Sequence, residues 1–415
     1  MISEAVRQTE DDTVIANVAG VGGPSIEALG NDAGILDDAP LRVALEKYAM
    51  RTGQFPLWEL VAHYRAMGRF GISQELRSSI IDIASEGVQD PVLETWLPMT
   101  IDQTSGNYAT YCGLAHIDYL VGEPNPSAVR IDEFIAAAVC DLISHEARAY
   151  AHEPRPIQLV RARGAVRLLA HVDELAPTIR VDSVAISEAN RALELSSLPE
   201  GDFIYAAQNA TSLALIGISD VIIQGVERTL LPASRLHDEV MFIRNIQIFE
   251  CMYRQVGRAV EDALNYVGAG RGAEALEVLE QARARLLVVP ALFRVLTTMP
   301  ADVFAVIRGF THGRSAVQSR TYKRVEELSA PRPGVRDVLT LQQAFLANSA
   351  RLEHPDVLAD SMRRLDSAWR SMKRGHWGIT LKIIGNAPGT GGTAGAEYLR
   401  KAAETALFPE LMEGI

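Results

Sequence analysis

The feature that most constrains this chain is the recurrence of apolar residues at helical spacing along most of its length. Segments 41–49 and 57–64 each place their apolar residues on one helix face, and 130–149 continues that pattern with charges opposite. Strict alternation of apolar and polar residues, which strands require, is scarce. The sequence therefore predicts an all-α fold, built as a helical bundle.

Clusters of proline, glycine and small polar residues separate the helical segments. Three of them, at 122–127, 152–156 and 331–334, predict loops. Residues 1–40 are rich in Gly, Asp and Asn and predict an irregular N-terminal arm. A further turn cluster at 196–202 predicts a boundary, so we expect a helical N-terminal region at 41–200 and a second helical domain at 201–415.

Charge and cysteine usage exclude several classes of function. Forty Lys and Arg against 52 Asp and Glu give a net charge of −12, which disfavours nucleic acid and anionic membrane surfaces as partners. Cys112, Cys140 and Cys251 fit neither a disulfide framework nor zinc spacing, and we expect a cytoplasmic protein. The N-terminus is acidic, unlike a secretory signal, and the most apolar stretch, 210–226, contains Asp220. We therefore expect no secretory signal and no membrane span.

The N-terminal half contains several histidines without the clustered spacing of metal ligands. We interpret them as core or surface residues. They are His63, His116, His145, His152 and His171.

One histidine in the C-terminal half stands inside an apolar helix stripe. The stripe is Trp369, Met372, His376, Ile379 and Ile383, with spacings of 3, 4, 3 and 4. Two interpretations stay open at this point. His376 is either a hydrogen-bonded core histidine or an axial ligand of a haem iron, which requires a neutral imidazole.

A glycine-rich loop follows this stripe directly. Residues 385–395 contain five glycines, so the backbone there can lie close to a ligand, and a helix is predicted at 396–408. Thr390 and Thr393 have hydroxyl groups that suit a ligand, although Thr393 also suits the N-cap of the following helix. The loop lacks the Gly-Lys-Ser/Thr ending of a phosphate loop.

A third segment, 299–319, places an arginine at the edge of an apolar helix face. Val303, Phe304 and Ile307 form the face, and Arg308 follows Phe304 by four residues. A buried guanidinium needs an anionic partner, which is either a structural acid or a substrate carboxylate held by two parallel hydrogen bonds.

Together these segments resemble the tryptophan 2,3-dioxygenase family of haem-dependent oxygenases. His376, the Gly-Thr-Gly-Gly run at 389–392, Glu-Tyr-Leu-Arg at 397–400 and Phe-Pro-Glu-Leu at 408–411 are similar to the family's C-terminal signature. Ile307-Arg308 with 315–319 resembles a second family segment, and 237–254 resembles the family's His-Asp-Glu helix. The resemblance covers residues 235–415, so the second domain is expected to bind haem.

The resemblance implies a role for each matching residue. It makes His376 the proximal ligand of a haem b iron, and it assigns Gly391 and Gly392 to cofactor binding. It assigns the remaining matched positions to substrate binding or the haem pocket, with Arg308 on the substrate carboxylate. These positions are Arg308, Thr390, Phe242, Ile246 and Ser315.

Three departures from the family accompany the resemblance. Ile246 stands where such dioxygenases have a distal histidine, and Glu-Cys-Met at 250–252 replaces Glu-Leu-Trp. The paired tyrosines that usually precede the His-Asp-Glu helix are not evident at 211–235. Some 200 N-terminal residues have no counterpart in the simple dioxygenases, so their role as a cap or an oligomer contact stays open.

The resemblance implies an oxygenase that uses O₂ on tryptophan or a substituted indole amino acid. Ring cleavage to an N-formylkynurenine-type product is the first expectation, and it requires no catalytic base from the protein. Ile246 keeps monooxygenation or hydroxylation open, and a non-catalytic haem-binding or helical interaction protein is the alternative from another class. We also expect a homo-oligomer.

Overall fold

A computed structural model gives the fold of the chain. It describes residues 37–102, 107–179, 184, 187, 200–310, 318–333, 338–385 and 395–412. These residues form helices and no strand, which confirms the all-α prediction. Residues 1–36 of the expected N-terminal arm lie outside the described ranges.

The helices of the N-terminal half are α2 (Ala39–Ala49), α3 (Leu57–Met67), α4 (Gln74–Glu86), α5 (Pro91–Ile101), α6 (Tyr108–Tyr111), α7 (Leu114–Val121), α8 (Ala128–His152), α9 (Pro156–Leu169) and α10 (Val172–Leu175). Those of the C-terminal half are α12 (Glu200–Leu215), α13 (Asp220–Arg228), α14 (His237–Gly268), α15 (Gly272–Leu296), α16 (Ala301–Phe310), α17 (Arg320–Ser329), α18 (Leu341–Asn348), the 3₁₀ turn η4 (Ser349–Arg351), α19 (Pro355–Ile384), α20 (Ala396–Glu404) and α21 (Pro409–Met412).

Local sequence signals explain where several helices begin and end. The hydroxyl of Ser127 caps α8 by accepting a hydrogen bond from the Arg130 amide, and Pro156 begins α9. Gly122 ends α7 with φ of +87°, a conformation that glycine adopts without steric cost. The predicted helices at 41–49, 57–64 and 130–149 are confirmed as α2, α3 and α8, and the predicted loop at 122–127 joins α7 to α8.

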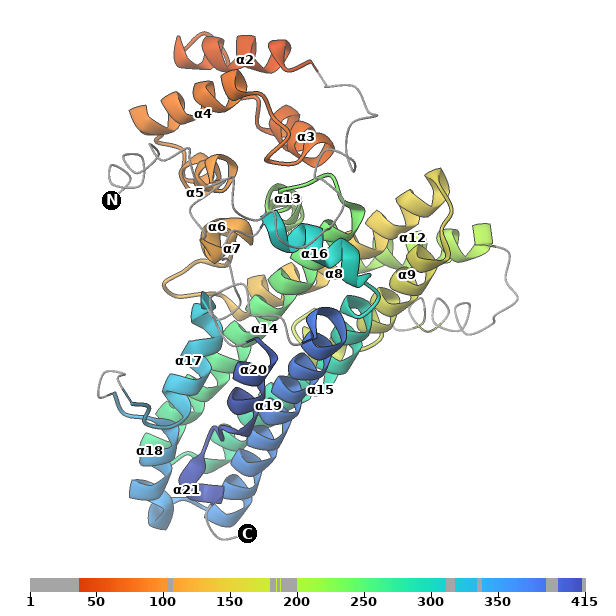
Figure 1. The fold of residues 1–415 in the computed structure, drawn as a ribbon. Helices are drawn as coiled ribbons and strands as arrows, with labels where there is room; N and C mark the ends of the chain where they lie inside the picture. The colour runs from red at the N-terminus through yellow and green to blue at the C-terminus, as the bar shows by residue number, and fades with distance from the viewer. Residues whose placement is uncertain are drawn as a thin grey trace.

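Long helices α14, α15 and α19 pack together in the lower half of the molecule as drawn, with α17, α18 and α20 alongside them (Figure 1). The same hydrophobic core includes residues of α7, α8 and α9, and in it α8 packs against α14, α9 against α15 and α7 against α8. This core therefore joins residues from both sides of the boundary predicted at 196–202. Most of that turn cluster lies outside the described residues, and the boundary remains a prediction.

Helices α2–α5 have a smaller core of their own at one end of the molecule (Figure 1). Its centre is Trp96, which is fully buried and donates a hydrogen bond from Nε1 to the Arg228 carbonyl, 3.1 Å away. Arg65 of α3 also reaches this segment, donating to the Glu227 carbonyl at 2.7 Å. These bonds connect the N-terminal helices to the end of α13, shortly before α14 begins.

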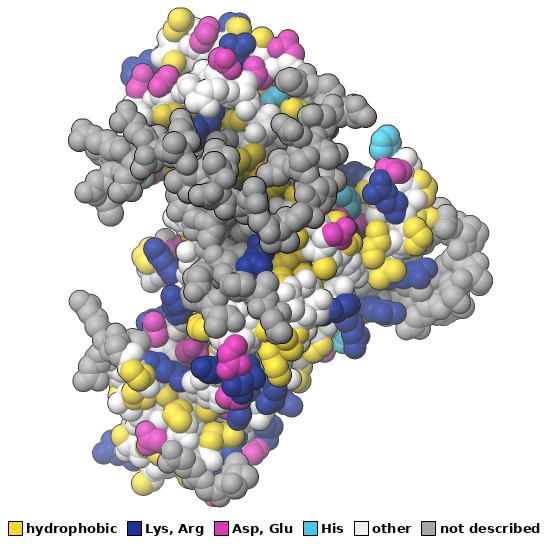
Figure 2. Space-filling view, viewed as in Figure 1, with side chains coloured by type: hydrophobic (Ala, Val, Ile, Leu, Met, Phe, Trp, Pro, Cys, Tyr) yellow, Lys and Arg dark blue, Asp and Glu magenta, His cyan; other side chains and the backbone are white. Residues whose placement is uncertain are grey.

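The described surface carries mixed charge. Figure 2 shows Lys and Arg interspersed with Asp, Glu and apolar side chains on one face of the molecule. Among the described helices, none is by itself long and apolar enough to cross a membrane. Helices α15 and α16 together have the length and apolar composition of a membrane span, but the chain bends by 100° between them.

Candidate functional site

A cavity of about 390 Å³ lies among the long helices of the C-terminal half. Helices α14, α15, α16, α17, α19 and α20 all contribute to its wall. Aromatic and aliphatic side chains dominate this wall, with fewer polar groups, as in cofactor and small-ligand sites. Its apolar side chains include Phe242, Ile246, Phe293, Phe304, Met372 and Ile379.

His376 lies on α19 and lines this cavity. The predicted stripe is confirmed, because Trp369, Met372 and Ile379 of the same helix are buried. Burial lowers the pKa of His376, and within the described part of the chain its ring has no hydrogen-bond partner. Phe293 stacks on the imidazole with ring centroids 6.3 Å apart. The result is a neutral imidazole against an apolar space, which is the donor that an axial haem site requires.

Arg308, Phe242 and Ile246 line the same cavity as His376. Arg308 extends from α16, and Phe242 and Ile246 lie one turn apart on α14. Phe242 contacts Phe304 edge-to-face, with centroids 5.6 Å apart. Four predicted site residues from three helices therefore meet at one space.

The other predicted site residues fall in two segments that the structure does not describe. Ser315 lies within 311–317, and Thr390, Gly391 and Gly392 lie within 386–394. Both segments are bounded by cavity-lining residues, since Arg308 and Ser319 flank the first, and Ile384 and Gly395 flank the second. The roles of the four residues remain predictions.

Sequence reasoning missed an acidic group in the cavity wall. Glu250, one helical turn after Ile246, is 1 % exposed and lines the cavity. It accepts hydrogen bonds from the Tyr108 hydroxyl at 2.7 Å and the Thr321 hydroxyl at 2.5 Å. Burial raises the pKa of Glu250, because removing the carboxylate from water disfavours its charge. The part of the cavity wall that α14 provides is therefore apolar at Ile246 and polar one turn later, at Glu250.

Paired tyrosines occur far upstream of the segment in which the sequence was searched for them. Tyr108 and Tyr111 both line the cavity, and Tyr111 donates to Glu239 of α14 at 2.9 Å. The same carboxylate accepts the amides of Ala233 and Ser234 at 2.9 and 2.7 Å. The Tyr-Ala-Thr-Tyr sequence at 108–111 was the available signal for this pair. It was missed because more than 120 residues separate it from α14.

A second polar group closes the cavity near α17 and α19. Glu326 accepts hydrogen bonds from Trp369 Nε1 at 3.2 Å, the Tyr322 hydroxyl at 3.1 Å and Lys373 Nζ at 3.1 Å. Burial lowers the pKa of Lys373, and the carboxylate beside it acts in the opposite direction. This ion pair fixes α17 against the helix that carries His376.

Comparison with characterised sequences gives distant matches and no match to a family model. A tryptophan 2,3-dioxygenase of Shewanella woodyi is 24% identical over 237 residues, covering 44% of this chain and 83% of that protein. Proteins of the same name from Anaeromyxobacter sp. (strain K) and Paraburkholderia phytofirmans are 26% and 25% identical. They match over 231 and 235 residues, covering 43% of this chain and 87% and 77% of those proteins. This similarity supports the family resemblance.

Proposed function

We propose that this protein is a haem-dependent oxygenase that acts on tryptophan or a substituted indole amino acid. The observation that carries the proposal is the convergence of His376, Arg308, Phe242 and Ile246 on one largely apolar cavity. The distant similarity to proteins named tryptophan 2,3-dioxygenase supports the same function.

The residues present fit a haem group. His376 offers a neutral imidazole with a lowered pKa, and the rings and aliphatic chains around it suit a flat apolar macrocycle. Phe293, stacked on the imidazole, restricts its orientation. A haem held in this way supplies O₂ binding and the redox chemistry.

The chain's own residues bind and orient the substrate. Arg308 binds the α-carboxylate through two parallel hydrogen bonds, since its planar guanidinium matches that group. Phe242 and Phe304 pack against the indole ring, and Thr390 contacts the amino-acid group. The apolar lining excludes water and holds the ring in one place, which is the protein's main contribution to the rate.

Ile246 favours a substituted indole over tryptophan itself. A hydrocarbon wall at this position cannot pair with an indole N–H, and an unpaired polar group in a closed site costs binding energy. An N-methylated ring avoids this cost. Glu250, one turn further along α14, and Tyr108 of α6 provide the polar contacts for a substituent on the ring.

The test is a visible absorption spectrum of protein purified with haem supplied, reduced and exposed to O₂ with L-tryptophan or N-methyl-tryptophan. We expect a histidine-haem spectrum that shifts with substrate and new near-ultraviolet absorbance from product. His376→Ala should lose haem, while Arg308→Ala should retain haem and raise KM. Arg308→Lys is the matched control, since it keeps the charge but not the paired hydrogen bonds. Wild-type protein that binds no haem would refute the proposal.

A further inference from the structure

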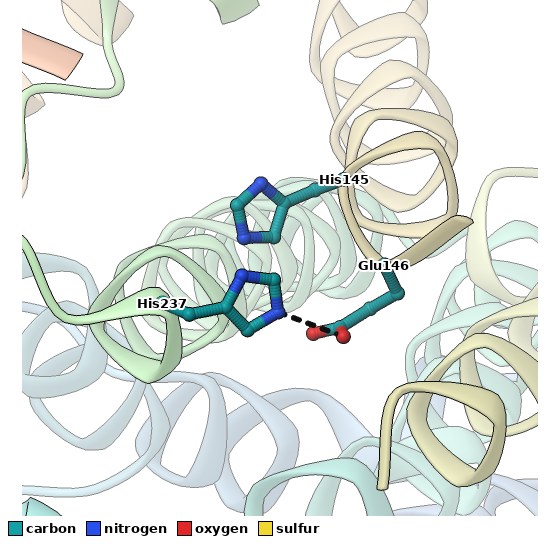
Figure 3. A group of neighbouring side chains, drawn as sticks. All are labelled: His145, Glu146 and His237. Carbon is teal, nitrogen blue, oxygen red and sulfur yellow. Dashed lines mark hydrogen bonds and ion pairs between the residues drawn. The ribbon is translucent and has the colours of Figure 1, made fainter. Parts of the chain in front are cut away.

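A cluster of two histidines and a glutamate lies away from the cavity, where α8 meets the start of α14. His145 and Glu146 lie near the end of α8, and His237 is the first residue of α14 (Figure 3). Their ligand atoms all lie within 4.8 Å of one another. His237 Nε2 is 2.9 Å from Glu146 Oε2, and the two imidazole rings stack with centroids 4.1 Å apart. None of the three residues lines the cavity described above.

Two buried atoms in this cluster have no hydrogen-bond partner among the described residues. They are Nε2 of His145 and Oε1 of Glu146, and the Glu146 side chain is fully buried. Burying a polar atom without a partner costs free energy, so such atoms in a native protein call for an explanation. A bound cation would explain both atoms, because imidazole and carboxylate are both ligands for divalent metals.

Charged side chains of both signs surround the cluster. Arg161 Nη1 lies 3.8 Å from Glu146 Oε1, but the same guanidinium also pairs with Asp238 and donates to Thr298. Two carboxylates therefore surround one guanidinium. On the other side, Asp141 pairs with Arg244. Arg65 also acts on Asp141 and Arg148 on His145, so carboxylates are not in excess over guanidinium groups here, and the case for a cation rests on the unpartnered atoms of His145 and Glu146.

We propose that His145, Glu146 and His237 bind a divalent transition-metal ion of the zinc type. Two imidazoles and one carboxylate are a known ligand set for such ions, and three protein ligands leave one tetrahedral position for water. Ligand atoms around a tetrahedral zinc lie about 3.4 Å apart, given metal–ligand distances of about 2.1 Å. The His237–Glu146 separation is near this value. Coordination by both rings requires the His145 side chain to rotate, because the two imidazoles stack on each other.

The metal would connect two parts of the chain that are distant in sequence. It would fix the end of α8 to the first turn of α14, and Phe242 of the cavity wall follows His237 by five residues. We therefore expect the metal to stabilise this junction, and the site does not depend on haem binding at His376.

The test uses full-length protein without a histidine tag, freed of metal by chelation and then titrated calorimetrically with Zn²⁺. We expect one tight site per chain, zinc that remains after desalting, and a higher thermal unfolding midpoint with Zn²⁺. X-ray absorption at the zinc edge should show nitrogen and oxygen ligands without sulfur. His145→Gln and His237→Gln should each weaken binding at least tenfold, and Glu146→Gln should weaken it as well.

Two controls separate this site from other binding. His152→Gln changes an exposed histidine at the end of the same helix and should leave zinc affinity unchanged. His376→Ala should also leave it unchanged, so failure of the haem proposal is distinguishable from failure here. Circular dichroism should show the same helical content in every variant. Absence of stoichiometric zinc in the wild type, or equal affinity in His152→Gln and the triad variants, would overturn the proposal.

Discussion

Two glycines on α19 give the clearest test of how tightly the candidate haem site is packed. A Cβ added at Gly375 would lie 2.8 Å from Cε2 and 2.9 Å from Cδ2 of Phe293. To restore contacts of 3.4 Å, the Phe293 ring has to move by about 0.6 Å. Phe293 is the ring that stacks on His376, so the movement is transmitted directly to the cavity. At Gly378, on the same helix, an added Cβ meets nothing within 4 Å.

The expected changes in unfolding free energy differ between the two positions. Alanine in place of glycine stabilises a helix interior by roughly 1 kcal/mol, and Gly378→Ala should show this gain in full. Gly375→Ala gains the same helix propensity, but overpacking against Phe293 costs about 1–3 kcal/mol. We therefore expect Gly375→Ala to be about 1–3 kcal/mol less stable than Gly378→Ala.

The assay is urea unfolding of both variants, followed by the visible spectrum of the reduced, haem-supplied proteins. Gly375→Ala should also change the haem spectrum, whereas Gly378→Ala should not. Combining Gly375→Ala with Phe293→Leu should recover part of the lost stability, because the two sites are in contact. Equal stabilisation by both alanines would refute the reasoning, since it would mean that Phe293 moves without cost.

Two further predictions concern buried carboxylates on α14. Because the pKa of Glu250 is raised in the folded protein, its protonated form favours folding at low pH, and this contribution is lost as pH rises through the raised value. Glu250→Gln should therefore flatten the fall in unfolding free energy as the pH rises above the ordinary glutamate pKa of 4.5, and an unchanged slope contradicts this. Tyr111→Phe removes one hydrogen bond to Glu239 and should cost about 1.5–3 kcal/mol in urea unfolding, with helical content retained. A loss near zero would show that the bond contributes nothing.

The parts of the site that sequence could predict are those whose signal is local. The stripe containing His376 is visible because helical periodicity acts over a few turns, and α19 buries the predicted face. Phe242 and Ile246 were predicted instead from the family resemblance of residues 237–254, which is also a signal within one continuous segment. Glu250 was seen only as part of a changed tripeptide, since its partner Tyr108 is 142 residues away. His145 and His237 were likewise separated along the chain, and no spacing rule connects them.

The start of α14 explains why long-range contacts matter so much in this protein. Three consecutive residues there hold different parts of the chain, with His237 against Glu146 of α8, Asp238 paired with Arg161 of α9, and Glu239 bound to Tyr111 of α6. One turn later, the same helix presents its first cavity residue, Phe242. A helix is stiff over such a distance, so a shift of α8 or α9 moves the cavity wall. The N-terminal half therefore helps to set the shape of the candidate site, although the motifs that predict the site lie in the C-terminal half.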